Sequence, residues 1–366
     1  MQNKFLTPGP INVSFMTKDT MLDDPPYFAS PEFGSILSDI KEPLKRVFNT
    51  NNPVLIGTGS GTLAMEACMN NFLEPHDSVI IISAGKYGDN WVKMAEYQQL
   101  RVTKLTVHLP ATELGWTEII GKLYYHLTHY NGYKAVFVTH CETTTATLAP
   151  IKRIAECVRA HSDTALVIVD AVSTLAVTDL RADLYDVVIS ASQKGLQLPP
   201  GLFFMTMGTR AFGKACLTKR RSFYFDVKTE MDRHYKNETS HTPATYLFKP
   251  LLHALRNIES QFGGVYSIQQ HCKKLQHHVL VTLAQYNIPV WSTSPVCTAI
   301  MTPHAAEIIT RMKEKNWYVG GGVRQYADKM LRIMHFGWAT DVDFLMEGVI
   351  LLCNTYHDVF EDEEDV

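Results

Sequence analysis

Residues 57–62, Gly-Thr-Gly-Ser-Gly-Thr, form the first segment whose composition suggests chemistry. They follow an apolar run at 53–56 and precede an amphipathic stretch at 63–72, so we expect them to join a strand to a helix. Glycine lets the backbone approach an anion closely, and the N–H groups at a helix N-terminus attract negative charge. Ser60 and Thr62 add hydroxyl donors. The segment therefore predicts an anion site, with a turn that binds nothing as the alternative.

The spacing of the glycines narrows the choice of anion. A nucleotide-binding P-loop would end in Gly-Lys-Ser or Gly-Lys-Thr, which this segment does not. A dinucleotide site would show Gly-x-Gly-x-x-Gly and an acid after the next strand, but the next apolar run ends in Ser83-Ala84-Gly85. The pattern thus favours a single phosphomonoester and argues against a nicotinamide-dependent dehydrogenase.

Asp170 directly follows the apolar run at 165–169. The carboxyl end of a central strand is where open α/β sheets bind ligands. A carboxylate buried there without a cationic partner is costly, which suggests that a ligand uses it. The alternative is that Asp170 caps a turn, with Ser173 and Thr174 as nearby donors.

Lys194 lies 24 residues after Asp170, between the apolar run at 186–191 and Pro199-Pro200-Gly201. Removal from water lowers a lysine pKa and makes the amine a nucleophile that can form an imine. A single lysine is more often a surface residue. In combination, a phosphate site, a strand-end acid and a nucleophilic lysine match the requirements of pyridoxal 5′-phosphate.

The elements that must position these residues follow from the apolar runs. Seven runs precede residue 208, at 53–56, 78–83, 102–107, 135–140, 165–170, 186–191 and 202–206. Most are continuously apolar rather than alternating, as is typical of strands buried on both faces. Helical stretches such as 63–72 and 151–161 separate them. The pattern predicts an α/β fold with a mostly parallel, seven-stranded central sheet flanked by helices.

The second half of the chain predicts a small α+β domain. We expect helices opening at Thr242-Pro243 and covering 265–286, 305–315 and 341–356, and short strands at 289–291, 296–301 and 330–335. Gly320-Gly321-Gly322 is expected to be a turn. We expect an irregular N-terminal arm at 1–30, a large domain at 31–255, and a small domain at 256–366 with an acidic tail at 361–366.

Composition excludes several classes of protein. The chain of 366 residues is 46% hydrophobic, so it is not disordered. Its net charge is −3, and because 361–365 are all acidic, the remainder carries −3 + 5 = +2, with no basic block of the kind that binds nucleic acid. There is no apolar run long enough for a membrane span and no leader, which predicts a cytoplasmic location. The seven cysteines are scattered, so neither a disulfide framework nor a metal site is expected.

Seven short motifs, spread over nearly the whole chain, support a resemblance to a known family of proteins. They are Leu6-Thr7-Pro8-Gly9-Pro10, 57–62 with Glu66, His140-Cys141-Glu142-Thr143-Thr144-Thr145, 169–173, 190–194 with 198–201, 241–244 and 331–335. With these motifs the sequence resembles class V aminotransferases of the pyridoxal-phosphate fold-type I superfamily, whose fold is that of aspartate aminotransferase. It is most similar to the alanine–glyoxylate and serine–pyruvate group, with 2-aminoethylphosphonate–pyruvate transaminases nearby.

The resemblance implies roles for individual residues. Lys194 would form a Schiff base with the cofactor and Asp170 would hold a proton on its ring nitrogen. The other cofactor-binding residues would be Gly59, Ser60, Gly61, Thr62, Tyr87, Thr143 and Gln193. Thr242 would complete the phosphate site of the neighbouring subunit in a homodimer, and Arg332 would bind the substrate carboxylate.

The expected reaction is amino transfer from a small amino acid, such as alanine or serine, to glyoxylate or pyruvate through pyridoxamine phosphate. The chain departs from the family pattern at Phe28-Ala29, where relatives often have His-Arg, at Thr239, where many have tyrosine, and at Ala146, where glycine is usual. Alternatives are a 2-aminoethylphosphonate transaminase, a lyase such as a cysteine desulfurase, and a binding scaffold without cofactor. Cys297 and Cys353 lie in an expected strand and helix, which argues against the desulfurase.

Overall fold

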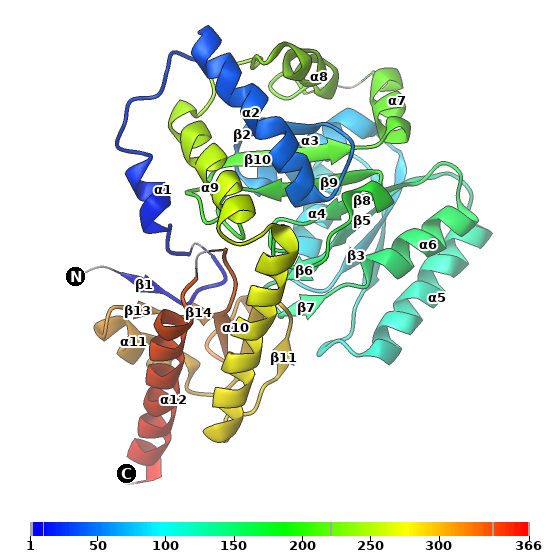
Figure 1. Ribbon diagram of the computed structural model, residues 1–366. Helices are drawn as coiled ribbons and strands as arrows, with labels where there is room; N and C mark the ends of the chain where they lie inside the picture. Colours follow the sequence, from blue (N-terminus) through cyan, green and yellow to red (C-terminus); the bar gives the residue numbers. More distant parts are fainter. Residues whose placement is uncertain (1–2, 10, 220–221, 339, 365–366) are drawn as a thin grey trace.

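The computed structural model describes residues 3–9, 11–219, 222–338 and 340–364 (Figure 1). A seven-stranded sheet with helices on both faces forms the larger part. In sheet order its strands are β2 (Val54–Gly59), β10 (Gly201–Met207), β9 (Val187–Ala191), β8 (Leu166–Asp170), β5 (Tyr133–Thr139), β3 (Ser78–Ser83) and β4 (Arg101–Thr106). Only β10 runs antiparallel to its neighbours. All seven apolar runs are strands of one mostly parallel sheet, which confirms the predicted fold class.

Each strand places alternate side chains on opposite faces of the sheet. In β5, Val136 and Val138 belong to one buried cluster, whereas Ala135 and Phe137 belong to another. The first cluster includes helices α2 (Pro31–Phe48), α5 (Glu113–His129), α6 (Ile151–His161) and α9 (Phe248–Ser260). The second includes α3 (Gly61–Phe72), α4 (Lys86–Tyr97), α7 (Thr209–Leu217) and α8 (Val227–Lys236). With both faces covered, a ligand can reach the sheet only at the strand ends.

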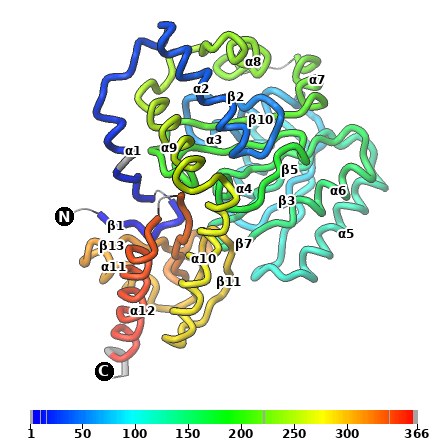
Figure 2. Tube along the Cα trace, viewed as in Figure 1, coloured from blue at the N-terminus to red at the C-terminus, as the bar shows by residue number. Residues whose placement is uncertain are grey.

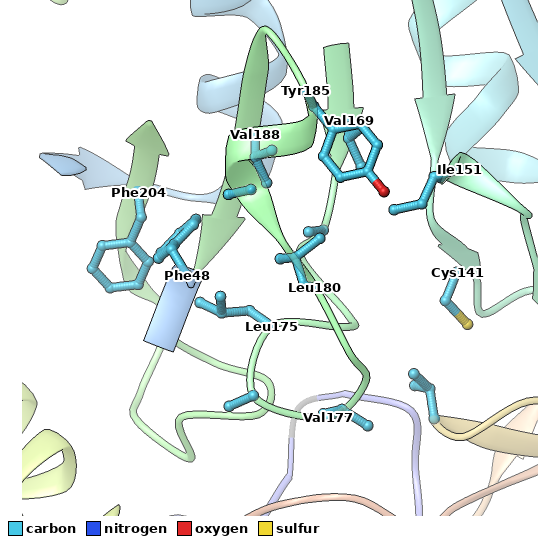
Figure 3. Packing of buried hydrophobic residues seen from close by; sticks show 14 of the residues in the cluster. Phe48, Cys141, Ile151, Val169, Leu175, Val177, Leu180, Tyr185, Val188 and Phe204 are labelled. Atoms are coloured by element: carbon cyan, nitrogen blue, oxygen red, sulfur yellow. The ribbon is translucent and has the colours of Figure 1, made fainter. Parts of the chain in front are cut away.

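Figure 3 shows part of the first cluster. Phe48 of α2 packs edge to face on Phe204 of β10, with ring centroids 6.3 Å apart. Leu175, Leu180 and Tyr185 come from the segment that follows β8 and pack against Val188 in the same region. The segment between Asp170 and Lys194 is therefore anchored in the core, so both functional candidates are held by packed elements.

The smaller part has its own sheet and core. Its strands, in order, are β11 (Ser292–Thr293), β12 (Cys297–Met301), β15 (Met330–Met334) and β14 (Gly320–Gly321), and its helices are α10 (Val265–Gln285), α11 (Ala305–Glu314) and α12 (Val342–Glu364). Strands β12 and β15 lie where expected, whereas the strand expected at 289–291 is wrong, because β11 begins only after it. The expected turn at 320–322 is wrong for its first two residues, which pair with β15. Glycine is needed there because a Cβ at Gly320 would lie 2.7 Å from Pro8 Cδ.

The N-terminal arm is more ordered than its prolines indicate. Strand β1 (Lys4–Phe5) pairs in parallel with β13 (Trp317–Tyr318), and α1 (Phe15–Asp19) follows. Leu6 extends this attachment, because its N–H donates to Tyr318 O at 2.8 Å and its carbonyl accepts from Met334 N at 2.8 Å. Figure 2 shows the start of the chain beside the smaller part of the protein, near α12. Pro10 of the N-terminal motif lies outside the described residues.

The remaining elements are short: β6 (Cys141–Glu142), β7 (Thr147–Leu148), and the 3-10 helices η1 (Ala182–Leu184), η2 (Thr245–Leu247) and η3 (Arg324–Tyr326). The helix expected to open at Thr242-Pro243 begins only at Phe248, because the residues before it, Thr245–Leu247, form the 3-10 helix η2 instead. The expected domain boundary at 255 falls inside α9, and the division remains a prediction. Helix α12 includes the acidic residues up to 364, whereas 365–366 lie outside the described residues. Within the described part, no helix is both long and apolar enough to span a bilayer.

Candidate active site

A cavity of about 490 Å³ lies at the carboxyl ends of β5, β8 and β9. It is lined by Ser60, Gly61, Thr62, Met65, Tyr87, Thr139, Cys141, Asp170, Val172, Ser173, Gln193 and Lys194. Seven of the residues predicted for the site are among these. The predicted residues that the described structure places elsewhere are Gly59, Thr143, Thr242 and Arg332. The sequence thus brings the cofactor candidates to one place, while their individual roles stay predictions.

Some residues of the glycine-rich segment pack in the core, and others line the cavity. Gly57 lies in β2, where a Cβ would come within 2.2 Å of the Phe203 ring, so this glycine serves the core. Gly59 has φ +150°, a conformation that side-chain-bearing residues rarely adopt. Ser60 stands at the N-cap of α3, yet its side chain makes no capping bond. The hydroxyl and the first turn of α3 therefore remain suited to an anion in the cavity.

Asp170 ends β8 and is 4% exposed. Burial raises the pKa of its carboxyl group to about 6, although Val172 N donates to Oδ1 at 2.9 Å. The turn-capping alternative is thus realised in part, but through Val172. Of the two donors named for it, the Thr174 hydroxyl is 3.0 Å from His140 Nδ1, and Ser173 lines the same cavity as Asp170. One carboxylate oxygen is held by the backbone while the side chain faces the cavity.

Lys194 is buried, and its Nζ donates a hydrogen bond to the carbonyl oxygen of Pro8. Burial lowers the pKa of this amine to about 8. Gly9, with φ +129°, lies so close that a Cβ there would come within 2.2 Å of Nζ. The N-terminal arm therefore covers the lysine. The sequence contained the motif at 6–10, but its contact with Lys194 depends on the pairing of β1 with β13.

Glu142 is a buried residue to which sequence reasoning assigned no role. One of its carboxylate oxygens accepts from Tyr87 N at 2.8 Å and Gly88 N at 3.2 Å, and the other accepts from Thr144 N at 3.1 Å. Burial raises the pKa of Glu142, and these hydrogen bonds oppose the rise. Glu142 thus fixes the first turn of α4 and with it Tyr87. Nearby, Ala146 has φ +52°, which explains why glycine would suit that position.

Arg332 lies in β15 and is held by carbonyl groups. Its Nη1 donates to Thr143 O at 2.9 Å, and its Nε and Nη2 donate to Gly321 O at 2.9 and 2.6 Å. These bonds use three of the five guanidinium N–H groups. Among the described residues, no carboxylate forms a salt bridge with Arg332. The guanidinium is therefore fixed in orientation while N–H groups remain for a carboxylate. Thr143 contributes its carbonyl group here, and its role in cofactor binding stays a prediction.

Thr242 lies in a different pocket from Lys194. It shares this pocket with Thr58, Tyr224 and His241 on the β2 side of the sheet. The predicted role of Thr242 concerns a neighbouring subunit, so it stays a prediction.

Replacing Gly9 by alanine should impair Lys194 without unfolding the protein. The added Cβ would collide with Nζ and would require an unfavourable φ, so the lysine side chain or the arm must shift. We expect kcat to fall by about 10- to 100-fold, as for a reacting group displaced by roughly 1 Å. Steady-state kinetics with thermal unfolding would measure this. Gly213→Ala on α7, where a Cβ meets nothing within 4 Å, is the matched control. Equal kcat in both variants would show that the arm does not position the lysine.

The pKa of Lys194 predicts how the cofactor-free protein reacts with pH. An amine attacks a carbonyl only when deprotonated, and Lys194 loses its proton at about pH 8 instead of near 10.5. The rate of imine formation between this protein and pyridoxal phosphate should therefore rise with pH and level off above about 8. Stopped-flow absorbance at constant ionic strength would measure the profile. A rate still climbing tenfold per pH unit at pH 9 would contradict the lowered pKa.

The cavity fits pyridoxal phosphate on independent grounds. It combines an amine with a lowered pKa, a buried carboxylate and an uncapped helix N-terminus, which match the aldehyde, the ring nitrogen and the phosphate. Gln193 also lines the cavity, and its amide nitrogen can donate a hydrogen bond to an anion. Ser60, Gly61, Thr62 and Gln193 would hold the phosphate.

Comparison with known proteins gives the family. The model of the aminotransferase class-V family matches residues 27–316. A soluble hydrogenase 42 kDa subunit from Anabaena cylindrica is 30% identical, covering 93% of this chain and 90% of its own. A serine–glyoxylate aminotransferase from Methylorubrum extorquens is 28% identical, covering 94% and 89%. The solved structure of an alanine–glyoxylate aminotransferase from Nostoc sp. superposes with a TM-score of 0.89 at 26% identity, covering 97% and 96%. The chain belongs to the class V aminotransferase family and is a pyridoxal-phosphate-dependent aminotransferase.

Proposed function

We propose that the protein moves an amino group from a small amino acid, such as alanine or serine, to a small 2-oxo acid such as glyoxylate or pyruvate. The observation that carries this is one cavity holding both Lys194 and Asp170, with Arg332 fixed nearby by Thr143 O. A planar guanidinium binds a carboxylate through two hydrogen bonds, which both amino and 2-oxo acids can accept. The names of the serine–glyoxylate and alanine–glyoxylate relatives support this substrate class.

Each of these residues would have a separate role in the reaction. Bound pyridoxal phosphate supplies an electron sink for the charge left on the substrate Cα. Lys194 Nζ would hold the cofactor covalently between turnovers and, once free, would act as the base that takes the proton from the substrate Cα. Asp170 would hold a proton on the ring nitrogen, and Arg332 would orient the substrate carboxylate. Pro8 and Gly9 cover Lys194 and exclude water.

We also propose that the protein acts as a homodimer in which Thr242 reaches the neighbouring phosphate site. Exposed aromatic side chains lie close to Thr242: Phe223, whose ring centroid is 5.8 Å from that of His241, is 93% exposed, and Tyr246 is 50% exposed. Such a surface is typical of an interface. Sedimentation should give twice the chain mass, and Thr242→Ala should weaken cofactor binding without changing the dimer. A monomer that retains full activity would rule this out. The cytoplasmic location is part of the same proposal and rests on the sequence alone.

A cysteine desulfurase is less consistent with the site. Cys297 lies in β12 and Cys353 in α12, both buried. Burial raises the pKa of Cys297 to about 11 and that of Cys353 to about 12, so neither thiol ionises readily. Production of sulfide from cysteine would reverse this ranking. A 2-aminoethylphosphonate donor lacks the α-carboxylate and would leave Arg332 without the partner proposed for it.

The direct test of the proposed function is a panel of amino acids mixed with the holoenzyme. Productive donors should remove the visible absorption of the bound cofactor and release the matching 2-oxo acid. Arg332→Gln should raise KM for donor and acceptor by about 100-fold, the loss of a bidentate charged contact, and change kcat less. Arg256→Gln, an exposed arginine of α9, is the control. Unchanged KM values would remove Arg332 from the substrate site.

A further inference from the structure

A second cavity of about 830 Å³ lies at the carboxyl ends of β3 and β4, and its lining residue Lys86 is next in sequence to Tyr87 of the first cavity. The chain leaves β3 toward β4 on one side and leaves β5 toward β8 on the other. Such a switch point opens a crevice in which α/β sheets bind ligands. The segment that follows β3 lines both cavities, with Tyr87 in the first and Gly85 in the second. The second cavity has no role in the reaction described above.

Positive charge dominates the second cavity. Lys86, Lys104 and Arg324 line it together with a single carboxylate, Asp89. That carboxylate accepts from Lys104 Nζ at 2.8 Å and also from Arg324. Burial would raise the pKa of Asp89, but its hydrogen bonds with Lys104, Ser83 and Arg324 outweigh burial and lower it. Within the described part of the chain, no carboxylate pairs with Lys86. With three cationic side chains and one carboxylate, the lining of the cavity carries a net charge of +2.

The Arg324 side chain is placed by a strained turn. Arg324 has φ +55°, which costs free energy for a residue with a side chain. The turn closes so tightly that a Cβ at Gly322 would lie 1.8 Å from Tyr326 O. Strain of this kind persists only where the surrounding structure enforces it, and it gathers at ligand sites. The turn brings Arg324 from the smaller part of the protein to Asp89 on α4.

The second cavity lies next to the proposed substrate carboxylate. Arg332 is held by Thr143 O and Gly321 O. The same two segments continue into Thr144 and Val323, which line the basic cavity. A substrate bound by Arg332 through its α-carboxylate therefore has the basic cavity on the neighbouring side of Thr143.

We propose that this basic cavity binds a second acidic group on the substrate, so that dicarboxylic amino acids and their 2-oxo acids are also accepted. Lys86 is the main contact, with Lys104 and Arg324 supplying the surrounding positive charge. The inference rests on the proposed function, because it extends the same substrate site. The recognised chemistry is that of a small oxyanion, which can be carried by a substrate side chain or be free in solution.

The test compares aspartate with alanine, which differ by one carboxylate, in the holoenzyme. The ratio of kcat/KM for aspartate to that for alanine should fall about fivefold in Lys86→Met, the size of one partly exposed charge pair. It should stay unchanged in Lys93→Met, an exposed lysine on the same helix. An unchanged ratio in Lys86→Met would overturn the inference. A second contrary result would be an effect of inorganic phosphate on alanine turnover that needs Lys86, together with an unchanged aspartate-to-alanine ratio. That result would show that the cavity binds a free anion and not a substrate side chain.

Failure of the proposed function would show differently, because neither amino acid would then remove the absorption of the bound cofactor. Calorimetric titration with succinate would in that case test whether the second cavity binds a carboxylate. Binding weakened about fivefold in Lys86→Met but not in Lys93→Met would support the anion site. Equal binding in all three proteins would refute it.

Discussion

Replacement of Lys194 by alanine is expected to lower turnover by at least about 10⁴-fold, because one amine serves as both covalent anchor and proton carrier. The structure supports both roles, since Nζ lies in the cavity wall and burial lowers its pKa to about 8. Turnover should be measured in single-turnover and steady-state experiments with excess pyridoxal phosphate. The cofactor can then still occupy the cavity through its phosphate contacts.

The Lys194 result needs controls for charge and for folding. Lys194→Arg keeps a cation but cannot form the covalent bond, so its turnover should be equally low. Lys93→Ala removes an exposed lysine and should retain full activity. The Lys194→Ala protein should also stay folded, because the lost side chain borders an existing cavity. Turnover within tenfold of the unmodified enzyme in Lys194→Ala would exclude the proposed chemistry.

Replacement of Asp170 by asparagine should reduce turnover by about 10²- to 10³-fold, the size of losing one preorganised electrostatic group. An amide cannot hold a proton on the ring nitrogen as a carboxylate does. Asparagine nearly keeps the shape and can still accept from Val172 N. The effect should therefore appear in kcat more than in folding.

The same substitution should stabilise the cofactor-free protein at pH 8. The folded-state pKa of Asp170 is raised from 3.8 to about 6, so stability is lost as pH rises from about 4 through 6. Above that window the buried carboxylate costs up to about 3 kcal/mol, which asparagine avoids. Thermal unfolding at pH 8 and pH 4 would measure this, with a gain expected only at pH 8. A loss of stability at pH 8 would indicate a structural role for Asp170.

The large sheet could be predicted from sequence because its strands are buried on both faces. The run at 78–83, for example, matches β3 residue for residue. Such strands need apolar, β-branched residues at every position, a pattern that few other elements share. The two-residue strands carry no such pattern. Gly320–Gly321 and Lys4–Phe5 are strands only because partners distant in sequence lie beside them.

The candidate site was predictable where one residue type at a strand end implies chemistry, as for Asp170 and Lys194. Residues that only position other groups could not be predicted from their type. Gly57 suggested an anion site but packs on Phe203, and Glu142 holds Tyr87 through bonds that depend on where α4 begins. The carbonyl groups that orient Arg332 have no side-chain signature at all.

The central claim is that Lys194 carries the cofactor, and reduction with borohydride tests it most directly. Reduction fixes a cofactor bound as an imine to its lysine, and peptide mass spectrometry then locates the added mass. We expect one phosphopyridoxyl group per chain, attached at Lys194 and absent from Lys194→Arg. A group found on another lysine, or no fixed group on a protein that retains activity, would contradict the account.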